Sequence, residues 1–176
     1  MEINERFPWA AAIIAPKPTS VLLEIGCGAG LLTGLIADKL TTGSITGIDQ
    51  SHPMIRMATQ RNQAAVSSGK AAFQTGSFAK MEFPDHTFDK VFAFNVNFFW
   101  KQPAKELQLI SQCLKRKGEL FVFYQTPGGI DRKLCESIKT RLEENGFRVS
   151  DTLFGQFSVS AAFCIIAKPP ASLPRN

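Results

Sequence analysis

The strongest constraint on the fold is a short apolar segment that runs into a cluster of glycines. Residues 21–30 read Val-Leu-Leu-Glu-Ile-Gly-Cys-Gly-Ala-Gly, an apolar run that carries one acid and ends in alternating glycines. Glycine adopts backbone conformations that other residues avoid, and it lets a ligand approach backbone N–H groups closely. Because apolar residues recur with helical spacing over 30–40, this part of the chain predicts a strand–turn–helix unit with a ligand site at the turn.

The same alternation of strands and helices continues along the chain. Short apolar runs predict strands at 21–25, 44–49, 70–75, 88–95 and 118–125. Residues with helical spacing lie between these runs, for example Leu107, Ile110 and Leu114. Two further strands, 147–154 and 160–167, lie so close in sequence that they must pair antiparallel, because a parallel pair needs a long crossover. The sequence therefore predicts one α/β domain, a doubly wound and mostly parallel sheet between two helical layers.

An acid ends the second predicted strand. Residues 45–49 are apolar until Asp49, whose carboxylate stands where a nucleoside ribose needs a hydrogen-bond acceptor. A dinucleotide-binding fingerprint would need a glycine at position 31, and this chain has Leu31 there. Asp49 and the glycine turn together predict a nucleoside cofactor, and Leu31 disfavours NAD.

Three segments in register resemble the class I, Rossmann-like methyltransferases that use S-adenosylmethionine (SAM), and within them the methyltransferase type 11-like domain. Residues 24–30, followed by Asp49, resemble the SAM site of that family. Residues 83–92 resemble the segment PFPD-x-x-FD-x-V of its fourth strand, and residues 114–120 resemble the LKPGG-x-L entry to its fifth strand. The resemblance extends from residue 20 to about residue 168.

This resemblance implies SAM as the cofactor and S-adenosylhomocysteine (SAH) as its product. It implies a sheet in the order 3-2-1-4-5-7-6 with an antiparallel last strand. Residues 1–176 are then one SAM-dependent methyltransferase domain, made of an N-terminal lid segment (1–20), a Rossmann-like core (21–168) and a tail (169–176).

The resemblance also implies which residues contact the cofactor. The glycine turn would bring backbone groups to the amino-acid part of SAM. Glu24 would support this turn or merely cap a loop. Asp49 would accept hydrogen bonds from both ribose hydroxyls. Met54 would either contact the adenine or lie on the buried face of its own helix. The family usually has an acid at the position of Ser77, so this chain departs from the pattern there. The expected cofactor-binding residues are Glu24, Gly26, Cys27, Gly28, Gly30, Asp49, Gln50, Met54, Ser77, Phe78 and Asn95.

The segment after the fourth predicted strand is expected to lie beside the transferred methyl group. Residues 95–100 have the outline of the N-P-P-[YF] loop of amine methyltransferases but lack both prolines, so an aromatic substrate wall is the favoured interpretation. The N-terminal segment would roof this open site, or a second subunit in a homodimer would complete it. The expected substrate-binding residues are Phe7, Trp9, Asn97, Phe98, Phe99 and Trp100. We expect neither His52, at a helix start, nor His86, in a turn, to act as a base. The sequence identifies no catalytic residue.

Charge and cysteine content limit the ligands and the cellular compartment that we expect for this chain. The net charge is +5, and the only compact basic cluster, residues 115–117, falls at a predicted helix C-terminus, where cations complement the helix dipole. The four cysteines are widely separated, which argues against a metal site and fits a reducing cytoplasm. The apolar stretch 9–15 is too short to cross a membrane.

Four functions remain open at this point. The favoured one is methyl transfer to a small or medium-sized acceptor by in-line displacement. A non-catalytic methyltransferase-like binding module would also fit the neutral Ser77. An RNA-modifying methyltransferase is compatible with the basic charge, although no RNA-binding patch is visible. A nicotinamide oxidoreductase is disfavoured by Leu31 and by the predicted terminal hairpin.

Overall fold

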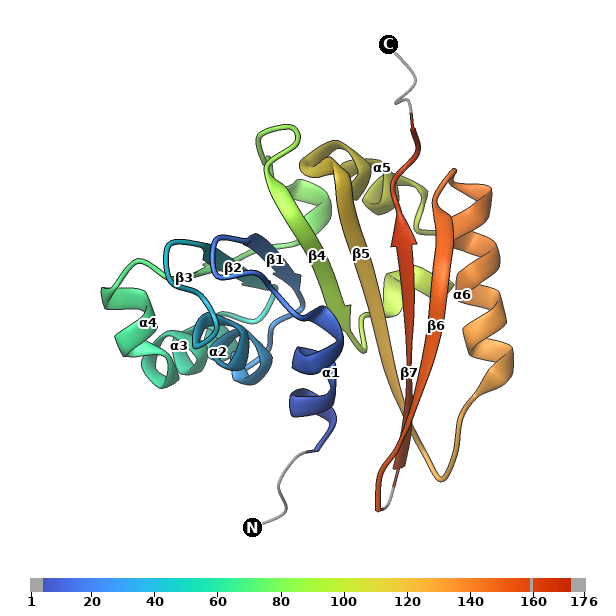
Figure 1. Ribbon diagram of the computed structural model, residues 1–176, viewed down its shortest axis with the longest axis horizontal. Coiled ribbons are helices and arrows are strands. Elements are labelled where there is room, and N and C mark those ends of the chain that lie inside the picture. The colour runs from blue at the N-terminus through green and yellow to red at the C-terminus, as the bar shows by residue number, and fades with distance from the viewer. Residues whose placement is uncertain (1–4, 159, 172–176) are drawn as a thin grey trace.

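The computed structural model describes residues 5–158 and 160–171. Within them the strands form one sheet in the order β3-β2-β1-β4-β5-β7-β6 (Figure 1). The strands are β1 (Val21–Ile25), β2 (Ser44–Asp49), β3 (Ala71–Thr75), β4 (Phe88–Phe94), β5 (Leu114–Pro127), β6 (Arg148–Gln156) and β7 (Ser160–Lys168). Strands β1 to β5 pair parallel, and β7 pairs antiparallel with both β5 and β6. The predicted fold class, strand order and reversed last strand are confirmed.

Helices cover both faces of this sheet (Figure 1). The helices are α1 (Arg6–Ile14), α2 (Leu31–Ala37), α3 (His52–Arg61), α4 (Gln63–Ser67), α5 (Ala104–Cys113) and α6 (Arg132–Glu144), with short 3₁₀ turns η1 (Phe78–Lys80) and η2 (Asn97–Trp100). Helices α1 and α2 share one apolar cluster with the sheet, and α5 and α6 share the other. The molecule is therefore the three-layer arrangement that the alternating pattern predicts.

Strand β5 has an uninterrupted apolar segment at residues 120–124. Phe121 and Phe123 belong to the cluster beneath α1 and α2, whereas Leu120 and Val122 belong to the cluster beneath α5 and α6. Successive side chains of a strand point to opposite faces, so a strand covered on both faces needs apolar residues at every position.

The start of β5 differs from the prediction. Helix α5 ends at Cys113 and β5 begins at Leu114, so residues 115–117 lie in the strand, and their assignment to a helix C-terminus is wrong. Leu114 is fully buried and pairs with Phe88 of β4. Lys115 donates to Asp89 at 2.8 Å. These pairings extend β5 to residues that helical spacing had assigned to the preceding helix.

The N-terminal segment is a helix docked on the sheet. Ala10 and Ile14 of α1 are fully buried, and Ala11 is nearly so. Residues 1–4 of the predicted lid segment and 172–176 of the predicted tail lie outside the described residues. No helix within the described ranges has the length and apolar character needed to cross a lipid bilayer.

Candidate functional site

Three neighbouring cavities lie at the carboxyl ends of the parallel strands. The β2–β4 cavity, which lies among the loops after β2, β3 and β4, has a volume of ≈ 350 Å³ and is lined by Ile25, Gly26, Ile48, Asp49, Gln50, Gly76, Ser77, Phe78, Ala79, Val96, Asn97, Phe98 and Glu106. The turn cavity has a volume of ≈ 290 Å³ and is lined by Arg6, Phe7, Glu24, Gly26, Cys27, Gly28, Ala29, Leu31, Leu32, Phe94 and Asn95. The β5–β7 cavity, of ≈ 390 Å³, is lined by Asn95, Gln125, Pro127 and Ser160. Gly26 lines both the first and the second cavity, and Asn95 lines both the second and the third.

The glycine turn between β1 and α2 needs glycine for two separate reasons. Gly26, Gly28 and Gly30 have φ values of +75°, +52° and +72°, a region that side chains other than glycine rarely adopt. A Cβ atom on Gly26 would also lie 2.6 Å from a methyl carbon of Val96, and one on Gly30 would lie 2.9 Å from the Cβ of Ala58. The turn can therefore come close both to the loop after β4 and to helix α3.

The N–H groups of this turn are used to hold the turn in place. Gly26 and Cys27 both donate to the carbonyl of Ile48, at 2.8 Å and 2.9 Å. Gly28 donates to Asp49 Oδ2 at 2.9 Å, and Gly30 donates to the carbonyl of Cys27 at 2.9 Å. The turn is thus bonded to β2, and these four donors are already satisfied before any ligand binds.

Asp49 connects the turn to the loop after β2. Besides accepting from Gly28, its carboxylate accepts from the backbone N–H of Ser51 through Oδ1 at 2.8 Å. A carboxylate has about four acceptor positions, so these two bonds leave capacity for further donors. Asp49 lines the β2–β4 cavity, where it can accept hydrogen bonds from a pair of adjacent hydroxyl groups.

Glu24 is an acid in an almost dry environment beside the turn. Its side chain is 2% exposed, and Thr33 Oγ1 of α2 donates to it. Burial raises the pKa of Glu24 to about 8, and the nearby charge of Asp49 adds to this effect. Glu24 is consequently mostly protonated at neutral pH, and it braces α2 against β1 while lining the turn cavity.

Aromatic and polar side chains form the walls of the β2–β4 cavity. The rings of Phe78 and Phe98 lie nearly parallel, with centroids 6.5 Å apart and an interplanar angle of 14°. Gln50 and Ser77, expected to bind the cofactor, and Asn97, expected to bind the substrate, line the same cavity. The first turn of α5 adds Glu106, which sequence reasoning missed because that helix was interpreted only through its apolar stripe.

Asn95 occupies a strained position at the end of β4. It is one of few residues other than glycine with positive φ, at 57°, among those that the structure describes. Its side chain Oδ1 accepts from the backbone N–H of Gln125 at 2.8 Å, so β5 holds this conformation in place. The side chain borders both the turn cavity and the β5–β7 cavity.

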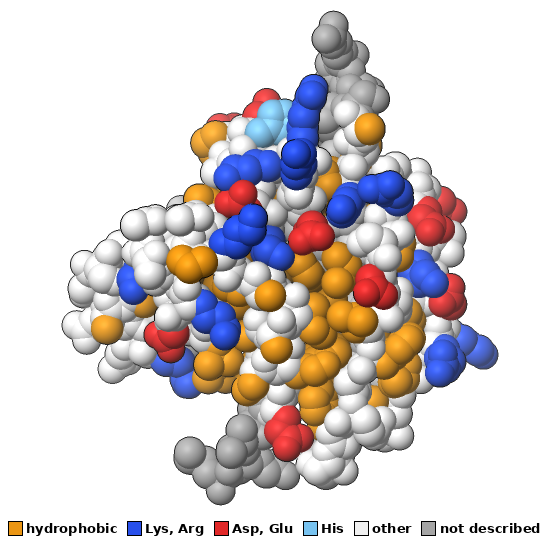
Figure 2. Space-filling view, in the orientation of Figure 1, with side chains coloured by type: hydrophobic (Ala, Val, Ile, Leu, Met, Phe, Trp, Pro, Cys, Tyr) orange, Lys and Arg blue, Asp and Glu red, His pale blue; other side chains and the backbone are white. Residues whose placement is uncertain are grey.

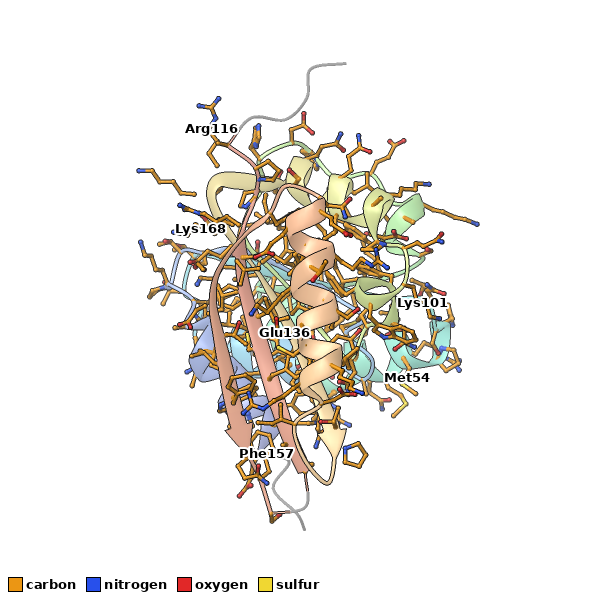
Figure 3. All side chains as sticks on the ribbon, turned by 90° about the vertical axis from the view of Figure 1, so that its right-hand side faces the viewer. Met54, Lys101, Arg116, Glu136, Phe157 and Lys168 are labelled. Atoms are coloured by element: carbon orange, nitrogen blue, oxygen red, sulfur yellow. The ribbon has the colours of Figure 1, made fainter. Side chains whose placement is uncertain are left out.

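Several residues predicted for the site line none of the three cavities. Met54 is 39% exposed and points away from the molecule at its edge (Figure 3). Trp9 packs edge-on against Phe123 and the turn between β6 and β7, Phe99 is fully buried in the core, and Trp100 is 40% exposed. Of the aromatic residues expected in the substrate wall, Phe7 lines the turn cavity and Phe98 lines the β2–β4 cavity.

The two histidines lie apart from the three cavities. His86 Nδ1 lies 2.9 Å from the carbonyl of Leu114, in the turn before β4. His52 begins α3 and is exposed. Cys27 does line the turn cavity, but burial raises the pKa of its thiol well above the ordinary value, which leaves it neutral and a poor nucleophile. Among the described residues no group of His, Cys, Asp and Glu is arranged to hold a metal ion.

A cluster of basic side chains lies at the end of the sheet opposite the cavities. Residues 115–117 start β5, and Arg148 pairs with Lys168 at that same edge. Figure 2 shows Lys and Arg side chains concentrated in the upper part of the molecule and hydrophobic ones over its lower centre. In Figure 3, Arg116 and Lys168 lie at the end of the sheet far from Phe157, which marks the end with the cavities.

Comparison with known proteins identifies a family. The family model described as "Methyltransferase domain" matches residues 23–122. Cycloartenol-C-24-methyltransferase 1 of Oryza sativa subsp. japonica is 33% identical over 109 residues, which are 62% of this chain and 31% of that protein. Sterol 24-C-methyltransferase erg-4 of Neurospora crassa is 38% identical over 85 residues, which are 48% of this chain and 22% of that protein. The chain thus spans a third or less of these relatives.

Solved structures share the fold along nearly the whole chain. The [4+2]-cyclase SpnF has a TM-score of 0.77 at 17% identity, covering 96% of this chain and 82% of that one. A SAM-dependent methyltransferase from Aquifex aeolicus has a TM-score of 0.75 at 19% identity, covering 92% of this chain and 88% of that one. Since one fold serves both a cyclase and a methyltransferase, the reaction must be argued from the site.

Proposed function

Because this chain belongs to the methyltransferase domain family, we propose that it binds SAM and transfers the methyl group to a small or medium-sized acceptor. SAH would be the product. The family match provides the chemistry, and the pair of cavities joined at Gly26 is the observation that carries the proposal. The first cavity holds Asp49, which can accept hydrogen bonds from hydroxyl groups, and the second is lined by the glycine turn.

The residues present fit the two halves of the cofactor. The adenosine would lie between the loops after β2, β3 and β4, with the ribose hydroxyls donating to Asp49 and the adenine beside Phe78 and Phe98. The amino-acid part would lie in the turn cavity, next to Gly26, which lines both cavities.

The acceptor would reach the methyl group past Asn95. The β5–β7 cavity adjoins the turn cavity at this residue, and its lining from Asn95, Gln125 and Ser160 is polar. SAM, when bound, would supply a methyl group activated by its positively charged sulfur: a lone pair of the acceptor would form the new bond to that carbon in line, and the electrons of the broken C–S bond would leave on the sulfur of SAH. The protein has to align the acceptor and exclude water. Asn95, held by Gln125, is the residue placed to orient the acceptor.

The domain organisation and the compartment that we propose for the enzyme follow from the packing and from the cysteines. We propose residues 21–168 as the catalytic core and α1 as its cover. We also propose a reducing compartment such as the cytoplasm, because the four cysteines are all buried and unpaired with one another. A small acceptor is preferred to RNA because the compact basic cluster at residues 115–117 lies at the edge opposite the cavities, where Arg148 pairs with Lys168.

Calorimetry with SAH tests the proposed function. Asp49→Ala removes the ribose acceptor and is expected to weaken SAH binding by about tenfold or more. Glu143→Ala, at an exposed position on α6, is the matched control and should bind like the wild type. Near-UV circular dichroism checks that both variants keep the native fold. Failure of the wild type to bind SAH, or equal binding by Asp49→Ala, would contradict the proposal and favour a non-catalytic binding module.

A further inference from the structure

Arg6, in the first turn of α1, lines the turn cavity together with Gly26 and Gly28. Its guanidinium lies 4.5 Å from the centroid of the Phe7 ring and 5.7 Å from that of Phe94. One terminal nitrogen, Nη1, donates to the side-chain carbonyl of Gln125 on β5. The planar group is therefore oriented by two rings and one hydrogen bond, and sequence reasoning gave it no role.

This guanidinium has no acidic partner among residues 5–158 and 160–171. None of the ion pairs found there includes Arg6. Its Nε is buried and lacks a hydrogen-bond partner in the same residues. Burial lowers the pKa of Arg6 from its ordinary value, as expected where a cation loses water without gaining an anion. Such a group is costly unless a ligand completes its surroundings.

Three backbone N–H groups of the glycine turn are already engaged and do not face an incoming anion as free donors. The N–H groups of Gly26, Cys27 and Gly28 are engaged with β2. Glu24, largely protonated at neutral pH, adds no compensating negative charge. Arg6 is the only Lys or Arg in the lining of this cavity.

We propose that Arg6 binds a carboxylate in the turn cavity. A guanidinium presents parallel N–H donors that match the two oxygens of a carboxylate. Two sources would present this group: the amino-acid part of SAM or SAH, which rests on the proposed function, and a carboxylate on the acceptor. Helix α1 would then contribute a binding residue in addition to covering the sheet.

The test compares wild type, Arg6→Gln and Arg6→Lys in calorimetry. The probes are SAH and 5′-methylthioadenosine, which keeps the nucleoside and sulfur but lacks the amino acid. Sodium benzoate and benzamide are also titrated into the free and the SAH-saturated protein. Arg132→Gln is the matched control, since Arg132 also lies over a phenyl ring but on α6. Thermal melting checks the fold of each variant.

If the carboxylate belongs to the cofactor, Arg6→Gln should weaken SAH binding about tenfold or more and leave the affinity for 5′-methylthioadenosine unchanged. Arg6→Lys should then restore part of the lost SAH affinity. For the acceptor source, SAH binding is unchanged, and benzoate, but not benzamide, binds the SAH-saturated wild type and fails to bind Arg6→Gln. The proposal is overturned if Arg6→Gln alters neither SAH nor benzoate binding. Absence of both SAH and 5′-methylthioadenosine binding in the wild type contradicts the proposed function instead, and benzoate on the free protein still decides the role of Arg6.

Discussion

At the scale of single residues, Glu24 combines burial with a raised pKa of about 8, compared with 4.5 as its ordinary value. In the unfolded chain Glu24 ionises near its ordinary pKa, whereas in the folded chain it stays protonated up to about pH 8. The folded state therefore binds more protons between these values. By linkage, this residue makes the protein progressively less stable as pH rises from about 4.5 to 8.

Glu24→Gln removes that titration while keeping a side chain that can accept from Thr33. We expect the variant to be more stable than wild type at pH 9 by about 1–3 kcal/mol, with the difference shrinking toward pH 5. Urea denaturation at both pH values measures this. A constant difference between the variants across that range would show that Glu24 does not titrate as described.

Replacing Gly26 is expected to destabilise the protein through two effects that variants can separate, a positive φ and a steric clash. Gly26→Ala should destabilise the protein by about 2–4 kcal/mol, from backbone strain and from the clash with Val96. Gly69→Ala is the matched control, because Gly69 has a similar φ of +74° but open space around it, and it should cost only about 1 kcal/mol. Adding Val96→Ala to Gly26→Ala should recover part of the stability, as measured by thermal unfolding. No recovery would argue against close contact between the turn and Val96.

At the scale of elements, helix α1 couples packing to the site. Ile14, at its C-terminal end, is fully buried, while Arg6 and Phe7 at its other end line the turn cavity. Ile14→Ala should cost about 2–4 kcal/mol of stability and also weaken SAH binding, because loosening α1 moves the cavity wall. The neighbouring Ile13→Ala, at a partly exposed position, serves as the control with a smaller effect on both. Unfolding and calorimetry on the same samples would reveal whether the two losses occur together.

Strand β5 shows how an element overrides local sequence preference. Helical spacing extended the preceding helix to Leu114, and the basic residues after it suggested a helix end. The structure instead begins β5 at Leu114, because pairing with Phe88 and burial of its side chain stabilise the extended form. Such long-range contacts are invisible to a reading of neighbouring residues.

At the scale of the whole molecule, the basic edge and the cavities are separated by the length of the sheet. The double variant Arg116→Gln/Lys117→Gln removes two exposed charges from that edge. SAH binding should stay at the wild-type value and change little between low and high salt, since surface charges at this distance are screened. A marked loss of SAH affinity, measured by calorimetry at two salt concentrations, would show that the basic edge acts on the site.

The sequence by itself determined the fold class, the strand order through its family resemblance, and the position of the glycine turn and Asp49. These features depend on local patterns: apolar periodicity, glycines at a turn, and an acid at a strand end. Only the tertiary structure placed Arg6, Gln125 and Glu106 around the cavities, because they come from elements whose proximity is set by packing. It also placed Phe99 in the core and Trp100 on the surface, since burial on one side of a short 3₁₀ turn is decided by its neighbours in space.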